Sequence, residues 1–98
     1  MEIEITWDES KRQSNIAKHG FDFARVVSAF SEDVFMEIED CRKNYGEIRM
    51  NLLTHVGSDL LHITYSPRTI RNEDGFTLQA RIISIRAANK KERQLYVK

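Results

Sequence analysis

Apolar and polar residues alternate along four stretches of this chain, which is the pattern of strands that bury one face. The alternation is strict over residues 2–7 and returns at residues 33–39, where Val34, Met36 and Ile38 share one parity. It continues over residues 48–56 and again from Asp59. We therefore expect these four stretches to be strands.

The third and fourth strands are joined by Gly57 and Ser58, a pair suited to a two-residue hairpin turn with glycine first. Such a turn fixes the register, because it places Val56 opposite Asp59 and Met50 opposite Tyr65. One face then holds Met50, Leu52, Leu61, Ile63 and Tyr65, and the other holds Arg49, Asn51, His55, His62 and Thr64 with Leu53 and Leu60. The first face is predicted to be core and the second half polar.

A fifth strand is expected from Leu78 to Arg86, with apolar residues on both faces as in the interior of a sheet. Proline cannot donate to a strand ladder, so we expect Pro67 to end the fourth strand. The polar stretch 68–77 that follows is then interpreted as a loop.

Three helices are predicted between and after these strands. Asp22 is a suitable cap for a helix that places Phe23, Val26, Val27 and Phe30 on one apolar face. Asn89 precedes a final helix, with Glu92 three residues later to complete a capping box. This helix has few apolar residues to dock it: Leu95, Tyr96 and Val97.

The first helix, from Glu9 to His19, is nearly devoid of apolar residues. Asp8 is placed to cap its start, and Gly20 to end it in a left-handed conformation. One face of this helix carries polar residues at i, i+4 and i+7: Lys11, Asn15 and Lys18. We expect a helix of this composition to be kept for what it contacts.

This order of elements predicts an α+β fold: strand, two helices, an antiparallel sheet of three to four strands, and a final helix, with the helices against one sheet face. The 98 residues, 41% of them hydrophobic, are enough for one domain spanning 1–98. No apolar run approaches the ~20 residues of a membrane span, so neither a membrane segment nor a signal peptide is expected. With Cys41 alone, a reducing cytoplasm is the expected location.

The net charge of zero hides an asymmetry along the chain. Residues 1–49 contain seven Lys or Arg and eleven Asp or Glu, whereas residues 50–98 contain eight and four. A neutral total disfavours a general nucleic-acid coat protein, but the basic second half leaves room for a local phosphate site.

The opening polar helix and its surroundings form a recognisable pattern. It reads WDxxKxxxNxxKHGxxF, filled by Trp7, Asp8, Lys11, Asn15, Lys18, His19, Gly20 and Phe23. Later stretches add Tyr45-Gly46-Glu47 with Arg49, and the run RIISIRAANKKERQLY over residues 81–96. Together they resemble the BrnT family of toxins, with Ile85 where that family's pattern has a small alanine.

The resemblance implies a RelE-like fold and a ribonuclease that cleaves RNA to inhibit translation. It also implies a cognate, BrnA-like antitoxin of the ribbon-helix-helix DNA-binding type. The two would form a hetero-oligomer that contacts DNA only through the antitoxin. No membrane and no cofactor are expected. Two alternatives stay open: a toxin that binds a protein target without cutting RNA, and a decayed toxin that keeps only its antitoxin-binding surface.

RNA cleavage without a metal needs a base for the 2′-hydroxyl, an acid for the leaving oxygen, and cations for the charge on phosphorus. The catalytic candidates are His19, Glu47, Arg49, Arg81 and Arg86. The candidates for RNA contact are Trp7, Lys11, Asn15 and Lys18. The sequence does not separate base from acid among them.

Each candidate also has a purely structural interpretation. Trp7 fits a sheet core, the helix face fits solvent, and His19 fits a helix end. Arg81 and Arg86 can pair with Glu37 or Glu39 across the sheet. His55 and His62 share one face, but without a third ligand we interpret them as exposed and unligated.

Overall fold

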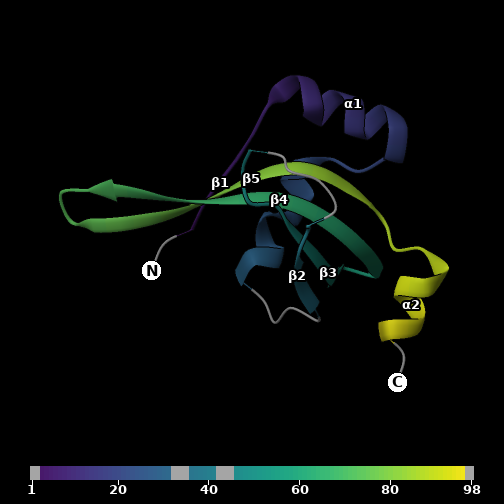
Figure 1. Ribbon diagram of the computed structural model, residues 1–98. Helices are drawn as coiled ribbons and strands as arrows, with labels where there is room; N and C mark the ends of the chain where they lie inside the picture. The colour runs from purple at the N-terminus through teal and green to yellow at the C-terminus, as the bar shows by residue number, and fades with distance from the viewer. Residues whose placement is uncertain (1–2, 32–35, 42–45, 97–98) are drawn as a thin grey trace.

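The fold is a five-stranded sheet with helices around it, seen in a computed structural model that describes residues 3–31, 36–41 and 46–96. In chain order the elements are β1 (Ile3–Trp7), α1 (Glu9–His19), the 3₁₀ helix η1 (Phe23–Ser31), β2 (Met36–Glu39), β3 (Met50–Val56), β4 (Asp59–Asn72), β5 (Gly75–Ala87) and α2 (Lys90–Tyr96). The strands lie in the order β1-β5-β4-β3-β2. Figure 1 shows α1 above the sheet as drawn, η1 below it and α2 beside one end.

The α+β class is confirmed, but the sheet is mixed and larger than expected. β1 runs parallel to β5, from Ile3 opposite Leu78 to Trp7 opposite Ile82, and the other neighbours are antiparallel. The alternation of apolar and polar residues in β1 predicts one buried face. It does not indicate which strand pairs with β1 or whether the two strands run parallel. The helices also do not share one face of the sheet (Figure 1).

The predicted β3–β4 hairpin is confirmed in full. Val56 lies opposite Asp59 and Met50 opposite Tyr65, with Gly57 at a positive φ of 64°. The face predicted to be core packs against η1, and its fully buried members are Leu52, Leu61, Ile63, Ile82 and Ile85 with Phe23 and Val26 of η1. Ile85 is therefore accommodated in the core without exposure. We call the opposite side of the sheet, which holds Arg49, Asn51 and His62, the second face.

The helix expected after Asp22 is a 3₁₀ helix, and its cap is confirmed because Asp22 Oδ1 accepts the Ala24 N–H at 2.9 Å. A 3₁₀ helix has three residues per turn, so side chains recur at i+3 and not at i+4. Accordingly Phe23 and Val26 are fully buried while Val27 is 45% exposed. The prediction that Val27 shares the apolar face was wrong.

Pro67 does not end β4, and residues 68–77 are not a loop. β4 continues to Asn72 and returns as β5 from Gly75, so the two strands form a long hairpin. β3 begins at Met50, opposite Tyr65, so at Pro67 the neighbour of β4 is β5 alone; proline is tolerated on such an edge. We call residues 68–79 the hairpin arm, and Figure 1 shows it projecting away from the sheet.

The remaining boundaries differ by small amounts. β2 is described from Met36, so the expected residues 33–35 lie outside the described part of the chain, and β3 begins at Met50 instead of Ile48. The capping box of α2 is confirmed, since Glu92 N–H donates to Asn89 Oδ1 at 2.8 Å and Asn89 N–H to Glu92 Oε1 at 2.9 Å. Among the described residues, no helix is both long and apolar enough to cross a membrane.

Candidate active site

Three of the predicted catalytic side chains meet on the second face of the sheet. Arg81 Nη2 donates to both carboxylate oxygens of Glu47, at 2.6 and 2.7 Å, and Arg49 Nε lies 3.4 Å from Glu47 Oε2. Glu47 and Arg81 border a cavity of about 520 Å³, and Arg49 contacts this pair through Glu47. We call this cavity the groove, and its lining is Glu47, Ile48, Ser66, Pro67, Arg68, Gln79 and Arg81.

Backbone contacts hold the segment before β3 against the sheet at this point. Ser66 lies opposite Arg81 in the β4–β5 ladder, and its hydroxyl donates to the carbonyl of Ile48 at 2.8 Å. The Arg49 carbonyl accepts the Asp40 N–H at 2.7 Å. These bonds place Glu47 over β5, which the sequence could not show because the segment is irregular.

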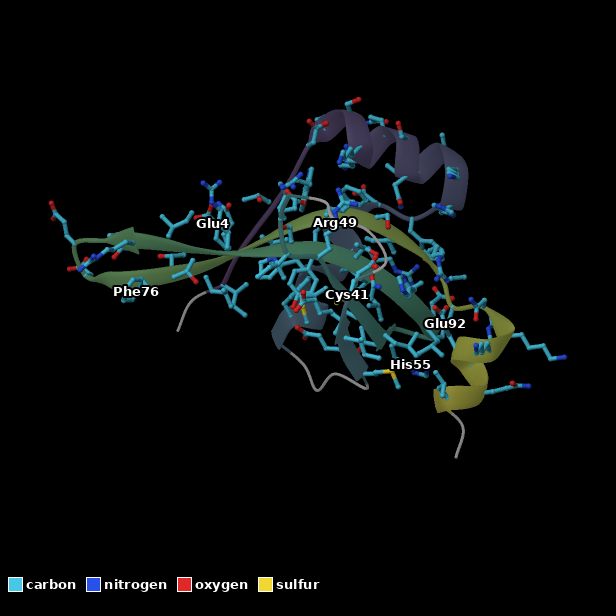
Figure 2. The ribbon with its side chains drawn as sticks, viewed as in Figure 1. Glu4, Cys41, Arg49, His55, Phe76 and Glu92 are labelled. Carbon is cyan, nitrogen blue, oxygen red and sulfur yellow. The ribbon has the colours of Figure 1, made fainter. Side chains whose placement is uncertain are left out.

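The electrostatics of the groove favour an anion. Two guanidinium groups, of Arg49 and Arg81, contact the carboxylate of Glu47, and Arg68 adds a third cation to the lining of the groove. The side chains of Glu47, Arg49 and Arg81 keep 30%, 24% and 37% of their surface exposed, so a ligand can reach them. Guanidinium forks match the oxygens of a phosphate as they match a carboxylate. Figure 2 places Arg49 over the middle of the sheet.

Arg86 belongs to a different cluster. Its guanidinium makes a two-pronged pair with Glu92 of α2, with distances of 2.8 and 2.9 Å, and His62 Nε2 lies 3.8 Å from the same carboxylate. The Arg86 hydrogen bonds are the main reason why the pKa of Glu92 is lowered to about 2. Arg86 lies about 15 Å along β5 from Arg81 at the usual rise per residue. The structure therefore does not bring Arg86 to the groove.

The alternative pairings expected for these arginines were wrong. Glu47 and Glu92 are the partners of Arg81 and Arg86, in place of Glu37 or Glu39. Glu37 instead accepts a hydrogen bond from the Tyr65 hydroxyl at 2.5 Å. Burial, followed by this contact with a carboxylate, raises the pKa of Tyr65.

The residues of α1 have separate environments. Lys11 and Lys18 are exposed, whereas Asn15 is buried and binds backbone: its Nδ2 donates to the carbonyls of Phe21 and Ile85, each at 2.9 Å, and its Oδ1 accepts the Ile85 N–H at 3.0 Å. His19 is half-buried in the last turn and is not among the residues that line the groove.

Trp7 packs against the core, as its structural interpretation predicts. Its ring meets the ring of Phe23 edge to face, with centroids 6.2 Å apart. RNA contact by Trp7 and by Asn15 stays a prediction, but each side chain already contributes to the fold.

The histidines and the cysteine show no metal centre in the described ranges. No group of three or more His, Cys, Asp or Glu among these residues is placed to hold an ion. The prediction that both histidines are exposed was wrong for His62, whose side chain is only 14% exposed beside Glu92. Cys41 is exposed, and its thiol lies 3.8 Å from Glu39 Oε2.

Sequence reasoning missed Ser66, Arg68 and Gln79 as parts of the groove. Arg68 falls in the stretch that was predicted to be a loop, so its position two residues along β4 from Ser66 could not be expected. The signal that could have found it is the two-residue spacing from Ser66, which places both side chains on one face once β4 is extended.

Comparison with protein families matches residues 7–92 to BrnT toxin, described as "Ribonuclease toxin, BrnT, of type II toxin-antitoxin system". No curated protein matches the chain. The match covers most of the 98 residues, including α1, the groove and the capping box of α2. The chain therefore belongs to the BrnT family of ribonuclease toxins of type II toxin–antitoxin systems.

Proposed function

We propose that this protein is an endoribonuclease that cuts RNA in the groove, without a metal ion, and thereby inhibits translation in the cytoplasm. The observation that carries this proposal is the cluster of Glu47, Arg49 and Arg81, in which Glu47 and Arg81 line one accessible cavity and Arg49 contacts Glu47. The family membership supplies the substrate class. RNA cleavage by internal attack needs a proton acceptor beside cationic groups, and this cluster offers both.

In the proposed reaction Glu47 accepts the proton of the 2′-hydroxyl. The freed 2′-oxygen attacks the neighbouring phosphorus, and the bond from phosphorus to the 5′-oxygen breaks. Arg81 and Arg49 stabilise the negative charge that builds on the other phosphate oxygens. The leaving 5′-oxygen takes a proton from water at the open side of the groove. The products are a 2′,3′-cyclic phosphate and a 5′-hydroxyl.

Substrate entry must compete with the existing ion pair. The phosphate takes the place of one carboxylate oxygen on Arg81, which frees that oxygen to face the 2′-hydroxyl. Because the pair is partly exposed, exchanging one anionic partner for another costs little. Arg81 would thus position the base as well as the phosphate.

The test is cleavage of end-labelled RNA by purified protein without ribosomes, in the presence of EDTA. Arg81→Ala should lower the rate by about 10²–10³, the usual effect of removing one positioned donor. Arg93→Ala is the control, because Arg93 is an exposed arginine on α2 away from the groove. A single 2′-deoxy substitution at the cleaved position should block the reaction.

Other results would overturn the scheme in different ways. Cleavage that stops in EDTA would contradict metal independence, and unchanged rates in Arg81→Ala would remove the groove as the site. Growth arrest by a protein that cuts no RNA would favour the alternative of a toxin acting by protein binding. A protein that neither cuts RNA nor arrests growth would be an inactive relative.

We also propose that a BrnA-like antitoxin of the ribbon-helix-helix type neutralises this protein in a hetero-oligomer. Membership in a toxin–antitoxin family implies a protein partner. The zero net charge of the chain agrees with DNA contact through the antitoxin alone. A RelE-like relationship of the fold is part of the same proposal, supported by the helices that precede a largely antiparallel sheet.

A further inference from the structure

The groove extends past the proposed catalytic cluster to the base of the hairpin arm. Arg68 and Gln79 lie opposite each other in the β4–β5 ladder, and both line the groove. Each is two residues along its strand from the Ser66–Arg81 pair, so all four side chains share the second face. The step between the two pairs is about 6.7 Å, similar to the spacing of successive phosphates in an extended nucleic-acid strand.

The charge of Arg68 is not neutralised by the described part of the protein. Among those residues, Arg68 has no hydrogen bond or ion pair through its guanidinium, and its side chain is exposed. Five other arginines pair with carboxylates: Arg12, Arg25, Arg49, Arg81 and Arg86. Of the remaining described arginines, Arg71 lies over the Phe76 ring and Arg93 donates to the Ala88 carbonyl, so each has a contact that Arg68 lacks. An unpaired guanidinium at the wall of a groove is suited to bind an anionic ligand.

Gln79 completes the polar wall beside Arg68. Its Nε2 donates to Glu4 Oε1 of β1 at 2.9 Å, which fixes the amide and leaves its oxygen as an acceptor. A ligand here would meet a cation and a neutral acceptor side by side. A nucleotide presents the matching groups, since it carries a phosphate and hydroxyl or amino donors.

We propose that Arg68 and Gln79 form a second phosphate subsite, which binds the phosphate next to the scissile one in a single-stranded RNA. The proposal rests on the proposed function and names the form of its substrate. A volume of about 520 Å³ is that of a pocket for a drug-sized molecule, which is enough room for one or two nucleotides of a single strand. The strand therefore leaves the catalytic cluster along the arm.

The arm supplies its own control. Arg71 lies three residues after Arg68, so the alternation of a strand places it on the opposite face, where its guanidinium lies over the Phe76 ring at 5.9 Å. Arg68→Ala and Arg71→Ala thus remove the same charge from the same exposed hairpin. Only the first variant should disturb a subsite on the second face.

The experiment measures binding of a short RNA with 2′-O-methyl groups throughout, which cannot be cut by internal attack. Fluorescence anisotropy over a salt series gives the slope of log Kd against log salt. Arg68→Ala should lower that slope by about 0.7, the value for one phosphate contact to a single strand. Arg71→Ala should leave it unchanged, and Arg68→Lys should largely restore it. Circular dichroism confirms that each variant is folded.

The outcomes separate this inference from the function on which it rests. Equal losses in Arg68→Ala and Arg71→Ala would indicate a diffuse positive field and overturn the subsite. Unchanged binding by Arg68→Ala, with cleavage still dependent on Arg81, would overturn the subsite and leave the proposed function intact. If Arg68→Ala weakens antitoxin binding but not RNA binding, the arm is a partner surface instead. If the wild type neither binds nor cuts RNA, both proposals fail.

Discussion

Asn15 should be among the most sensitive positions in this protein, because it replaces a missing strand neighbour. The parallel pairing of β1 with β5 stops at Ile82, so beyond that point no described strand lies beside this edge of β5. Asn15 supplies both a donor and an acceptor to the backbone of Ile85. The perturbation we consider is Asn15→Ala.

The size of the effect follows from what the substitution leaves behind. The N–H and C=O of Ile85 lose their partners in a buried setting, at about 1–3 kcal/mol each. The bond to the Phe21 carbonyl is partly buried and contributes about 0.5–1 kcal/mol. Alanine returns about 0.5 kcal/mol through its better helix propensity. We expect a net loss of about 4 kcal/mol, or roughly 16–32 °C in Tm for a chain of this size.

The assay is urea unfolding followed by circular dichroism, with Ser14→Ala as the control. Ser14 is exposed on the same helix, so its substitution should change the stability by less than about 0.5 kcal/mol. Asn15→Asp keeps the acceptor but presents a carboxylate to two carbonyl oxygens. Burial should raise the pKa of that carboxyl group. The loss relative to wild type should therefore shrink as pH falls and the group regains a proton to donate.

Two results would refute this reasoning. If Asn15→Ala costs no more than Ser14→Ala, the edge of β5 does not depend on the amide. If Asn15→Asp is as stable as the wild type at neutral pH, the carbonyl contacts of Nδ2 are not formed. In either case Asn15 would return to the group of candidates for direct RNA contact.

Three further predictions concern the core, α2 and the partner. Leu52→Ala and Ile63→Ala should each lower the stability by about 2–4 kcal/mol in thermal melts, because each side chain is almost fully buried opposite the other; Arg49→Ala should cost little. Folding lowers the pKa of Glu92 from 4.5 to about 2, so its ion pair with Arg86 stabilises the folded state above pH 4.5, and this contribution is lost as the pH falls through 2. In Glu92→Gln, the free energy of unfolding should therefore depend less steeply on pH between those two values. Antitoxin binding should protect residues 81–96 in hydrogen exchange, since α2 carries the exposed Lys90, Lys91 and Arg93 and its Leu95 borders an apolar cavity of about 220 Å³; protection only at 36–40 would place the partner on β2 instead.

The parts of the fold that could be predicted are those with local causes. The β3–β4 hairpin follows from a glycine turn and the alternation beside it, and the caps at Asp8, Asp22 and Asn89 follow from side chains within three residues. In each case the stabilising contact lies close to the signal in the sequence. No knowledge of the rest of the chain is needed.

The parts that could not be predicted depend on distant neighbours. Proline disrupts a strand that has a neighbour on each side, and Pro67 is tolerated here because β3 begins only opposite Tyr65. The parallel pairing of β1 depends likewise on β5, more than seventy residues away. The local pattern therefore predicted a loop over residues 68–77, whereas these residues belong to the hairpin arm.

The candidate site shows the same limit. Arg81 and Arg86 are five residues apart, a spacing that places side chains on opposite faces of a regular strand. A register shift between Thr64 and Tyr65 brings both to the second face, since their partners Ser66 and His62 are four residues apart. Even so, only Arg81 reaches Glu47, because that contact depends on the path of an irregular segment. Composition identified the right residue types, and the tertiary structure separated them into two clusters.

The opening motif of the family can now be divided by what each residue does in the fold. Trp7 and Phe23 pack in the core, Asp8 and Gly20 begin and end α1, and Asn15 binds β5. These five positions are explained by the need to form α1 and to attach it to the sheet.

Two motif residues, Lys11 and Lys18, are exposed and have no such role among the described contacts of their side chains. The fold requires neither ammonium group, and both lie on a helix that Asn15 fixes beside β5, the strand that carries Arg81. Of the three polar residues on this face, the two lysines can therefore contact RNA without loss of a contact that the fold uses, because Asn15 already binds the backbone of β5.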